Sequence, residues 1–190
     1  MAATFAVIGA MLAVLLVSAG PAAAMYPPPG DSCGTLRACI AALTNYEYSN
    51  DDGHKYEKPL GSNCNYFSTQ WHVAGAPQCS NGWYGEQWCM DFARWIYHQE
   101  GASVANLDHT AYSAKNYSTY RTVSSGAKPR VGDLAVWATE SHIGIVVSVD
   151  ATGRPTVVSG NSWNPNRGDY TAIWKNEYSV STFQGFAGPA

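Results

Sequence analysis

Residues 88–101 read Trp88-Cys89-Met90-Asp91-Phe92-Ala93-Arg94-Trp95-Ile96-Tyr97-His98-Gln99-Glu100-Gly101. Apolar side chains recur at positions 89, 92, 93, 96 and 97, which is the spacing of an amphipathic helix. Gly101 is a typical helix terminator. The pattern predicts a helix that begins near Cys89 and turns the face carrying Cys89 toward the protein core.

Cys89 would lie in the first turn of this helix, where backbone N–H groups are unpaired and the helix dipole favours an anion. Such a position stabilises a thiolate, so Cys89 is a candidate nucleophile. Position alone leaves a buried structural thiol as the alternative. Asp91 falls in the same turn, and we expect its carboxylate to point outward.

Apolar runs downstream predict strands near residues 133–138, 141–150 and 156–163. His142 stands at the start of the second strand, where it would be held rigidly beside a cleft. A thiol with a pKa near ~8.5 needs ~3.4 kcal/mol to reach a pKa of ~6, and a helix N-terminus supplies only ~0.3–2 kcal/mol. We expect the remainder to come from a protonated His142.

The turn between the second and third strands sets what faces His142. If Asp150 pairs with Gly153, the imidazole faces Asn161. If Gly153 forms a bulge instead, the register shifts by one residue and the neighbours become Gly160 and Ser162. We prefer Asn161, because its amide can accept the imidazole N–H and hold the ring.

The composition excludes several classes of protein. The 190 residues carry a net charge of −3, and only 13% of them are charged. A basic nucleic-acid-binding protein and a polybasic membrane-surface protein would both need a cationic excess. With 13% aromatic residues, the chain also does not resemble a disordered protein.

The N-terminus predicts export. An apolar run from Phe5 to Val17 is too short to span a membrane but has the length of a signal-peptide core. Ala22-Ala23-Ala24 fits the cleavage rule, so we assign residues 1–24 to a signal peptide, 25–59 to an N-terminal segment with a short helix, and 60–190 to the catalytic domain. No basic residue precedes the apolar run, so either the α-amine serves alone or the true start lies upstream.

Five cysteines in an exported chain suggest two disulfides and one free thiol. Cys64 and Cys79 lie in turn-rich segments, which suit a bridge. Cys33 and Cys39 would point apart on one continuous helix, so their pairing requires a bend, for which Gly34 is suited. Four cysteines allow three connectivities. We prefer Cys33–Cys39 with Cys64–Cys79, which leaves Cys89 reduced.

At this point the chain resembles the CHAP domain (cysteine, histidine-dependent amidohydrolases/peptidases), and most of all its secreted single-domain actinobacterial members. The likeness spans about residues 60–190 and rests on five motifs in the family's order. These are Trp88–Trp95, Lys128–Trp137, Ser141–Val146, Ser159–Asn161 and Ser181–Phe186.

The resemblance implies an α+β, papain-like fold of the NlpC/P60 type, with an antiparallel sheet packed against the nucleophile-bearing helix. It implies cleavage of an amide bond in bacterial peptidoglycan, as an amidase or an endopeptidase, with Cys89, His142 and Asn161 as the catalytic set. Where many members carry Glu, this chain has Ser159, so Asn161 would orient His142 alone. Gln87 is a weaker candidate for the oxyanion site.

Two other functions remain open, a papain-like protease acting on proteins and a catalytically silent module that binds the cell wall. Zinc binding lacks a closely spaced pair of ligands, and Asp51-Asp52 fits a solvated turn better than a calcium loop. We therefore expect no metal and no cofactor. The expected protein is a secreted monomer with a peptidoglycan substrate and no nucleic-acid or membrane partner.

Overall fold

The computed structural model describes residues 33–51, 56–72, 75–166 and 168–189. The predicted signal peptide, residues 1–24, lies outside them. Ser32–Ala190 form one compact unit, so the described part of the segment 25–59 shares a fold with the segment 60–190. Within the described residues, no helix is both long enough and apolar enough to cross a membrane.

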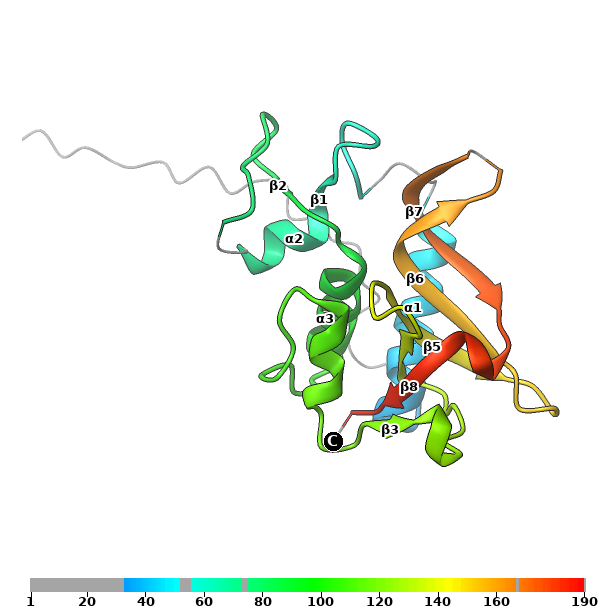
Figure 1. The fold of residues 1–190 in the computed structure, drawn as a ribbon. Coiled ribbons are helices and arrows are strands. Elements are labelled where there is room, and N and C mark those ends of the chain that lie inside the picture. Colours follow the sequence, from blue (N-terminus) through cyan, green and yellow to red (C-terminus); the bar gives the residue numbers. More distant parts are fainter. Residues whose placement is uncertain (1–32, 52–55, 73–74, 167, 190) are drawn as a thin grey trace, which may run out of the picture. The chain divides into compact units, whose positions relative to one another are not determined.

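Helices and antiparallel strands build an α+β fold, as predicted (Figure 1). The helices are α1 (Leu36–Asn50), α2 (Tyr66–Trp71) and α3 (Cys89–Gln99), with short 3₁₀ turns η1 (Ala111–Asn116), η2 (Val123–Ser125) and η3 (Val180–Thr182). The strands are β1 (Cys64–Asn65), β2 (Tyr84–Gly85), β3 (Arg121–Thr122), β4 (Leu134–Trp137), β5 (Ile143–Val149), β6 (Pro155–Asn164), β7 (Asp169–Glu177) and β8 (Phe183–Ala187).

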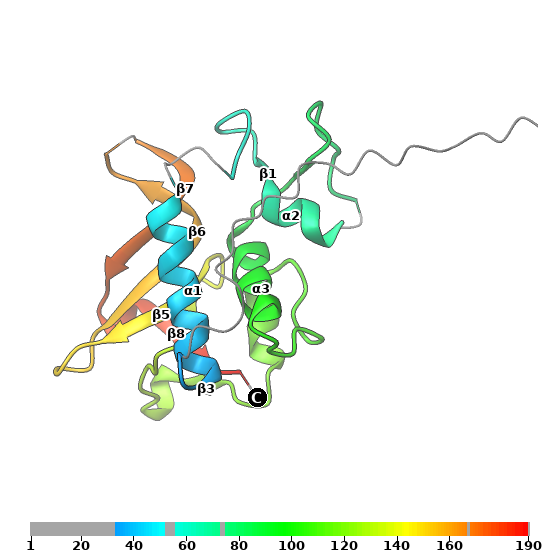
Figure 2. The same cartoon turned by 180° about the vertical axis from the view of Figure 1, so that it is seen from behind.

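Six strands form the main sheet in the order β3-β8-β4-β5-β6-β7, with every neighbouring pair antiparallel. Both α1 and α3 contact β5, which begins directly after His142, and β6, which carries Asn161. Figure 2 shows α1 lying across the sheet with α3 beside it. The helix that carries Cys89 therefore packs against the strands that follow His142.

The N-terminal segment contributes a longer helix than predicted. Thr35 caps α1 by accepting the backbone N–H of Ala38. Ile40 and Leu43 are buried, and the helix contacts β5, β6 and β7. The backbone N–H of Ile173 on β7 donates to the Asp51 carboxylate at the end of α1, at 2.7 Å. The helix thus covers the sheet as an integral part of the core.

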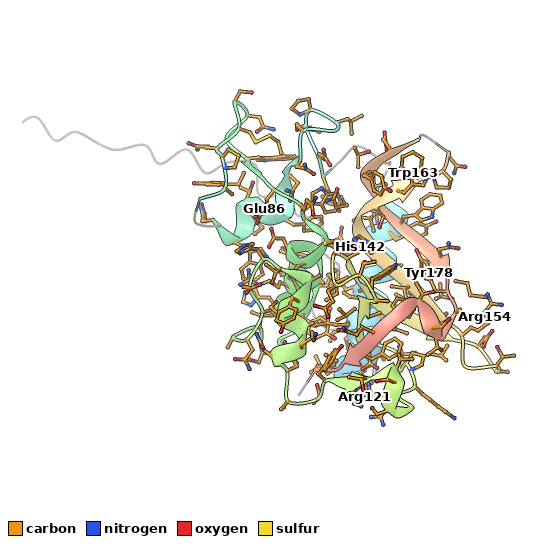
Figure 3. All side chains as sticks on the ribbon, viewed as in Figure 1. Glu86, Arg121, His142, Arg154, Trp163 and Tyr178 are labelled. Carbon is orange, nitrogen blue, oxygen red and sulfur yellow. A yellow bond between two sulfur atoms is a disulfide. The ribbon has the colours of Figure 1, made fainter. Side chains whose placement is uncertain are left out.

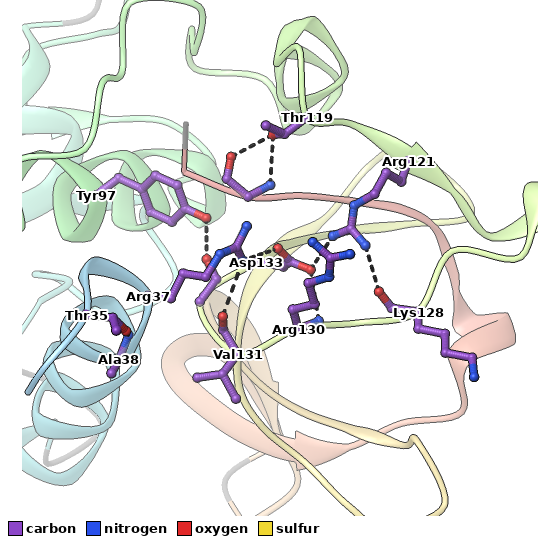
Figure 4. Close-up of polar contacts among 12 residues, drawn as sticks. Thr35, Arg37, Ala38, Tyr97, Thr119, Arg121, Lys128, Arg130, Val131 and Asp133 are labelled. Atoms are coloured by element: carbon purple, nitrogen blue, oxygen red, sulfur yellow. Dashed lines mark hydrogen bonds and ion pairs between the residues drawn. The ribbon is translucent and has the colours of Figure 1, made fainter.

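A buried carboxylate ties α1 to the loop before β4 (Figure 4). Asp133 is fully buried and accepts hydrogen bonds from Arg37 at 2.6 Å, Arg121 at 2.6 Å and the backbone N–H of Arg130 at 2.9 Å. The Tyr97 hydroxyl of α3 donates to the carbonyl of the adjacent Gly132 at 2.6 Å. These bonds fix the start of β4 against both helices.

The face of α3 predicted to be buried is buried. Cys89, Phe92, Ala93, Ile96 and Tyr97 all have at most 5% of their surface exposed. On the opposite side, Asp91 and Trp95 are buried as well, because α2 contacts this part of the helix. The Phe67 ring of α2 packs on three aromatic rings from the helix and its N-cap, namely Trp88, Phe92 and Trp95.

The preferred disulfides are both present. Cys33 pairs with Cys39, and Gly34, at a φ of 82°, makes the bend that brings the chain back to α1. Cys64 on β1 pairs with Cys79, which lies in the segment before β2. Cys89 is the free cysteine of the described residues.

The β5–β6 hairpin combines both predicted registers. At the turn, Gly153 forms a bulge, and the backbone N–H of Asp150 donates to the carbonyl of Arg154 at 3.0 Å. A second irregularity, between Val146 and Ser148 on the opposite strand, restores the other register, so that Ile145 faces Val158. The two extra residues stand on opposite strands and therefore offset one another.

Candidate active site

Cys89 and His142 meet at the junction of α3 and β5. The backbone N–H of Ile143, the residue after His142, lies near enough to the Cys89 sulfur to favour its thiolate. Both side chains line the same cleft, which has a volume of about 770 Å³. Figure 3 marks His142 at the start of β5, between α3 and the sheet. The structure thus brings together the two residues that the sequence proposes as nucleophile and base.

Close packing of the N-terminus of α3 against β6 positions Cys89 at the cleft. A Cβ at Gly160 would lie 2.5 Å from the Trp88 ring, so glycine is needed for the N-terminus of α3 to approach β6. Trp88 is fully buried, and its indole N–H donates to Glu57 at 3.1 Å. Trp88, the residue before Cys89, therefore fixes the N-terminus of α3 against β6 and Glu57.

Burial determines the charge state of Cys89. The thiol is 5% exposed, and desolvation raises its pKa to about 11. The N–H groups of Ile143, Met90 and Cys89 itself favour the thiolate, but they do not outweigh burial. The expected thiolate is therefore replaced by a neutral thiol in the free protein, because the site is drier than the sequence indicated.

His142 is also uncharged near neutral pH. Burial lowers the pKa of its imidazole to about 4. The Trp137 ring packs edge-on against it, with ring centroids 4.8 Å apart. Burial therefore acts against the protonated His142 that the sequence predicts, and both shifts favour a neutral thiol beside a neutral imidazole.

Ser162, which was the less favoured neighbour, is the hydrogen-bond partner of His142. Its hydroxyl lies 3.2 Å from Nε2, and the Ser159 hydroxyl lies 2.5 Å from that of Ser162. Both serines are buried on β6. When Ser162 accepts the Nε2 proton, Nδ1 is left unprotonated and can act as a base.

Asn161 lines the same cleft but does not make the bond predicted for it. Its buried Oδ1 has no hydrogen-bond partner in the described part of the chain. The cause is a register shift between Ser159 and Ser162 in the β6–β7 pairing, where Asn161 adopts a left-handed φ of 49°. This shift turns Asn161 aside and presents the next residue to the imidazole. The catalytic role of Asn161 stays a prediction.

Ser162→Ala is expected to lower kcat about 10-fold to 100-fold with little change in KM, because the imidazole would lose its orienting partner. Ser162→Thr keeps the hydroxyl and should restore most of the rate. Steady-state kinetics on peptidoglycan, the substrate that the sequence resemblance implies, with melting temperature as a check on folding, would test this role. An equal loss of activity in both variants would contradict it.

Asp91 does not point outward, contrary to expectation. It is fully buried because α2 covers this side of α3, and it accepts the Ser68 hydroxyl at 2.6 Å. Desolvation and a hydrogen bond with Asp91 raise the pKa of Glu86 to about 8, so Glu86 carries a proton near neutral pH. The charge on Asp91 adds to the rise in the pKa of the Cys89 thiol.

Other candidates have distinct positions. Gln87 is exposed and lines the cleft beside Cys89, within reach of a bound substrate. His98 packs against Trp71, and His72 packs against Tyr84. The described residues contain no cluster of three or more histidine, cysteine or acidic side chains that could hold a metal ion.

The depressed pKa of His142 predicts an acid-sensitive component of stability. An unfolded histidine takes up its proton near pH 6.5, but the folded one does so only near pH 4. The stability that the neutral His142 gives the fold is therefore complete above pH 6.5. It decreases as the pH falls from 6.5 toward 4. Chemical denaturation across this range should show a smaller loss of unfolding free energy in His142→Gln than in the wild type. Equal losses would contradict the assignment.

Of the comparisons with known proteins, one gives a match, and this match covers part of the chain. Neither the curated proteins nor the solved structures contain a match to the sequence. Among protein families, residues 78–161, which include Cys89 and His142, match the model of the CHAP domain.

Proposed function

We propose that this protein is a secreted cysteine hydrolase that cleaves amide bonds of bacterial peptidoglycan. The observation that carries the proposal is the meeting of Cys89 and His142 at one cleft, inside the segment that matches the CHAP domain. The paired cysteines fit export, because disulfides persist in oxidising compartments. A papain-like, NlpC/P60-type arrangement and a monomeric state are part of the same proposal.

The neutral pair defines the first chemical step. As the Cys89 sulfur attacks the carbonyl carbon, its proton passes to Nδ1 of His142, and the carbonyl oxygen takes up negative charge. His142 then gives that proton to the amine nitrogen as the C–N bond breaks. The amine product leaves, and a thioester to Cys89 remains.

Water completes the reaction. His142 accepts a proton from the water that attacks the thioester, and Cys89 recovers its proton as the C–S bond breaks. The backbone N–H of Cys89 lies in the unpaired first turn of α3 and can stabilise the oxyanion. Gln87 borders the same space and is the side-chain candidate for this role.

Mass spectrometry of the soluble products from purified peptidoglycan tests the proposal. An amidase would release stem peptides from the glycan, whereas an endopeptidase would release cross-linked or shortened muropeptides. Absence of both product types would overturn the proposed function. Cleavage of casein without cleavage of peptidoglycan would indicate a protease acting on proteins.

A further inference from the structure

Two of the pockets lined by described residues share Cys89, and their linings differ. The large cleft of about 770 Å³ and a smaller pocket of about 270 Å³ share Gln87, Cys89 and Ser141. A substrate bound across the nucleophile would therefore place chemically different parts in each. The contrast between the two linings indicates which part of the substrate each pocket would bind.

The large cleft is aromatic and uncharged. Its polar lining consists of amide and hydroxyl side chains together with His142, which is neutral above pH 4. The described residues that line it include no Asp, Glu, Lys or Arg. Its aromatic walls come from β4, β6, β7 and the segment after β7, and comprise Trp137, Trp163, Tyr170, Trp174 and Tyr178.

Trp163 and Tyr170 form an open platform at this cleft. Their ring centroids lie 5.0 Å apart, one ring on β6 and the other on β7. Trp163 is 46% exposed and Tyr170 is 64% exposed, although both are large apolar side chains. Figure 3 labels Trp163, His142 and Tyr178, all of which line the large cleft.

The smaller pocket has the opposite character. Glu86, His109 and Glu140 line it, and Glu140 is held at 2.9 Å by Lys115. The Glu140 carboxylate suits a charged part of a peptide, and the protonated Glu86 can donate a hydrogen bond to a peptide carbonyl.

We propose that Trp163 and Tyr170 form a saccharide subsite, which binds the glycan strand on one side of Cys89 while the peptide extends toward the smaller pocket. The C–H face of a pyranose ring carries a small positive potential and stacks on the negative face of an aromatic ring. Hydroxyl and acetamido groups then pair with neutral amide and hydroxyl side chains such as Asn176 and Thr139. This inference rests on the proposed function.

Binding to the inactive Cys89→Ala variant tests the subsite separately from catalysis. The probe is a β-1,4-linked N-acetylglucosamine tetrasaccharide, which carries no peptide and no charge, and the measurement is isothermal titration calorimetry. We expect the tetrasaccharide to bind, and we expect Trp163→Ala in this background to weaken binding about 10-fold or more. Tyr170→Phe should bind as well as its parent, because it keeps the ring.

Tyr112→Ala is the matched control. Tyr112 is 53% exposed and does not line either pocket, so its removal should leave binding unchanged. The subsite is overturned if the tetrasaccharide fails to bind at millimolar concentration, or if Tyr112→Ala weakens binding as much as Trp163→Ala. Either result would leave amide cleavage by wild-type protein intact, so it is distinguishable from failure of the proposed function.

Discussion

Cys89→Ala is expected to lower the rate of peptidoglycan hydrolysis at least ~10³-fold, because no covalent intermediate can form without the thiol. His142→Ala should lower the rate by a similar factor. With the pKa of Cys89 at about 11, the thiol cannot lose its proton near neutral pH without a base beside it. Because the two residues act as one unit, the double variant should be little worse than either single variant. Release of soluble muropeptides is the measurement.

His98→Ala is the matched histidine control. His98 is exposed near the C-terminal end of α3 and packs against Trp71, away from the cleft lining. This variant should retain wild-type activity, and circular dichroism should show that all the variants are folded. Hydrolysis that persists at the wild-type rate in Cys89→Ala would contradict the assignment of a cysteine-dependent enzyme.

The neutral site changes how Cys89 reactivity should be judged. A thiol whose pKa lies near 11 reacts slowly with iodoacetamide near neutral pH, even in an active enzyme. Slow alkylation of the free protein therefore does not identify a silent wall-binding module. The product assay separates the two functions, because only the enzyme releases fragments.

Periodicity along the sequence predicted the elements that carry the chemistry. The apolar spacing from Cys89 to Tyr97 identified α3 and its buried face, because a helix places those positions together. The runs that became β4, β5 and β6 were recognisable for the same local reason. Cys89 and His142 could thus be chosen from element type and position.

The partner of His142 could not be predicted, because bulges decide it. The Gly153 bulge and the irregularity near Val147 offset each other, and a further shift beside Asn161 selects Ser162. Each bulge moves every later side chain to the other face of the strand. Alternation within a strand does not reveal their number.

The burial of Asp91 and the pKa values arise from long-range packing. Asp91 is covered by α2, whose Ser68 is 23 positions away in the sequence. A helical pattern shows one apolar face, but it does not show what covers the other. Desolvation of Cys89 and His142 has the same origin, so their neutral charge state followed only from the three-dimensional structure.

Asp133→Ala is expected to destabilise the fold by about 3 kcal/mol or more, because it removes a buried charge that holds two arginines. Asp133 is fully buried, while the Arg37 and Arg121 side chains are 31% and 27% exposed. After the substitution these arginines can partly return to water. The loss of unfolding free energy should therefore lie near the lower end of the ~3–5 kcal/mol expected when a buried ion pair is broken. For a domain of this size, the melting temperature should fall by about 10 °C.

The exposed pair between Arg154 and Glu177 supplies the control for Asp133. Its charged atoms lie 3.0 Å apart, but the two side chains are 54% and 49% exposed. Glu177→Ala should therefore cost less than ~1 kcal/mol. Chemical denaturation of both variants compares the two ion pairs directly, and similar costs would show that Asp133 does not organise the core. A large difference would establish that the Asp133 contacts hold α1 and β4 together, and with them the strand that pairs with β5 beside His142.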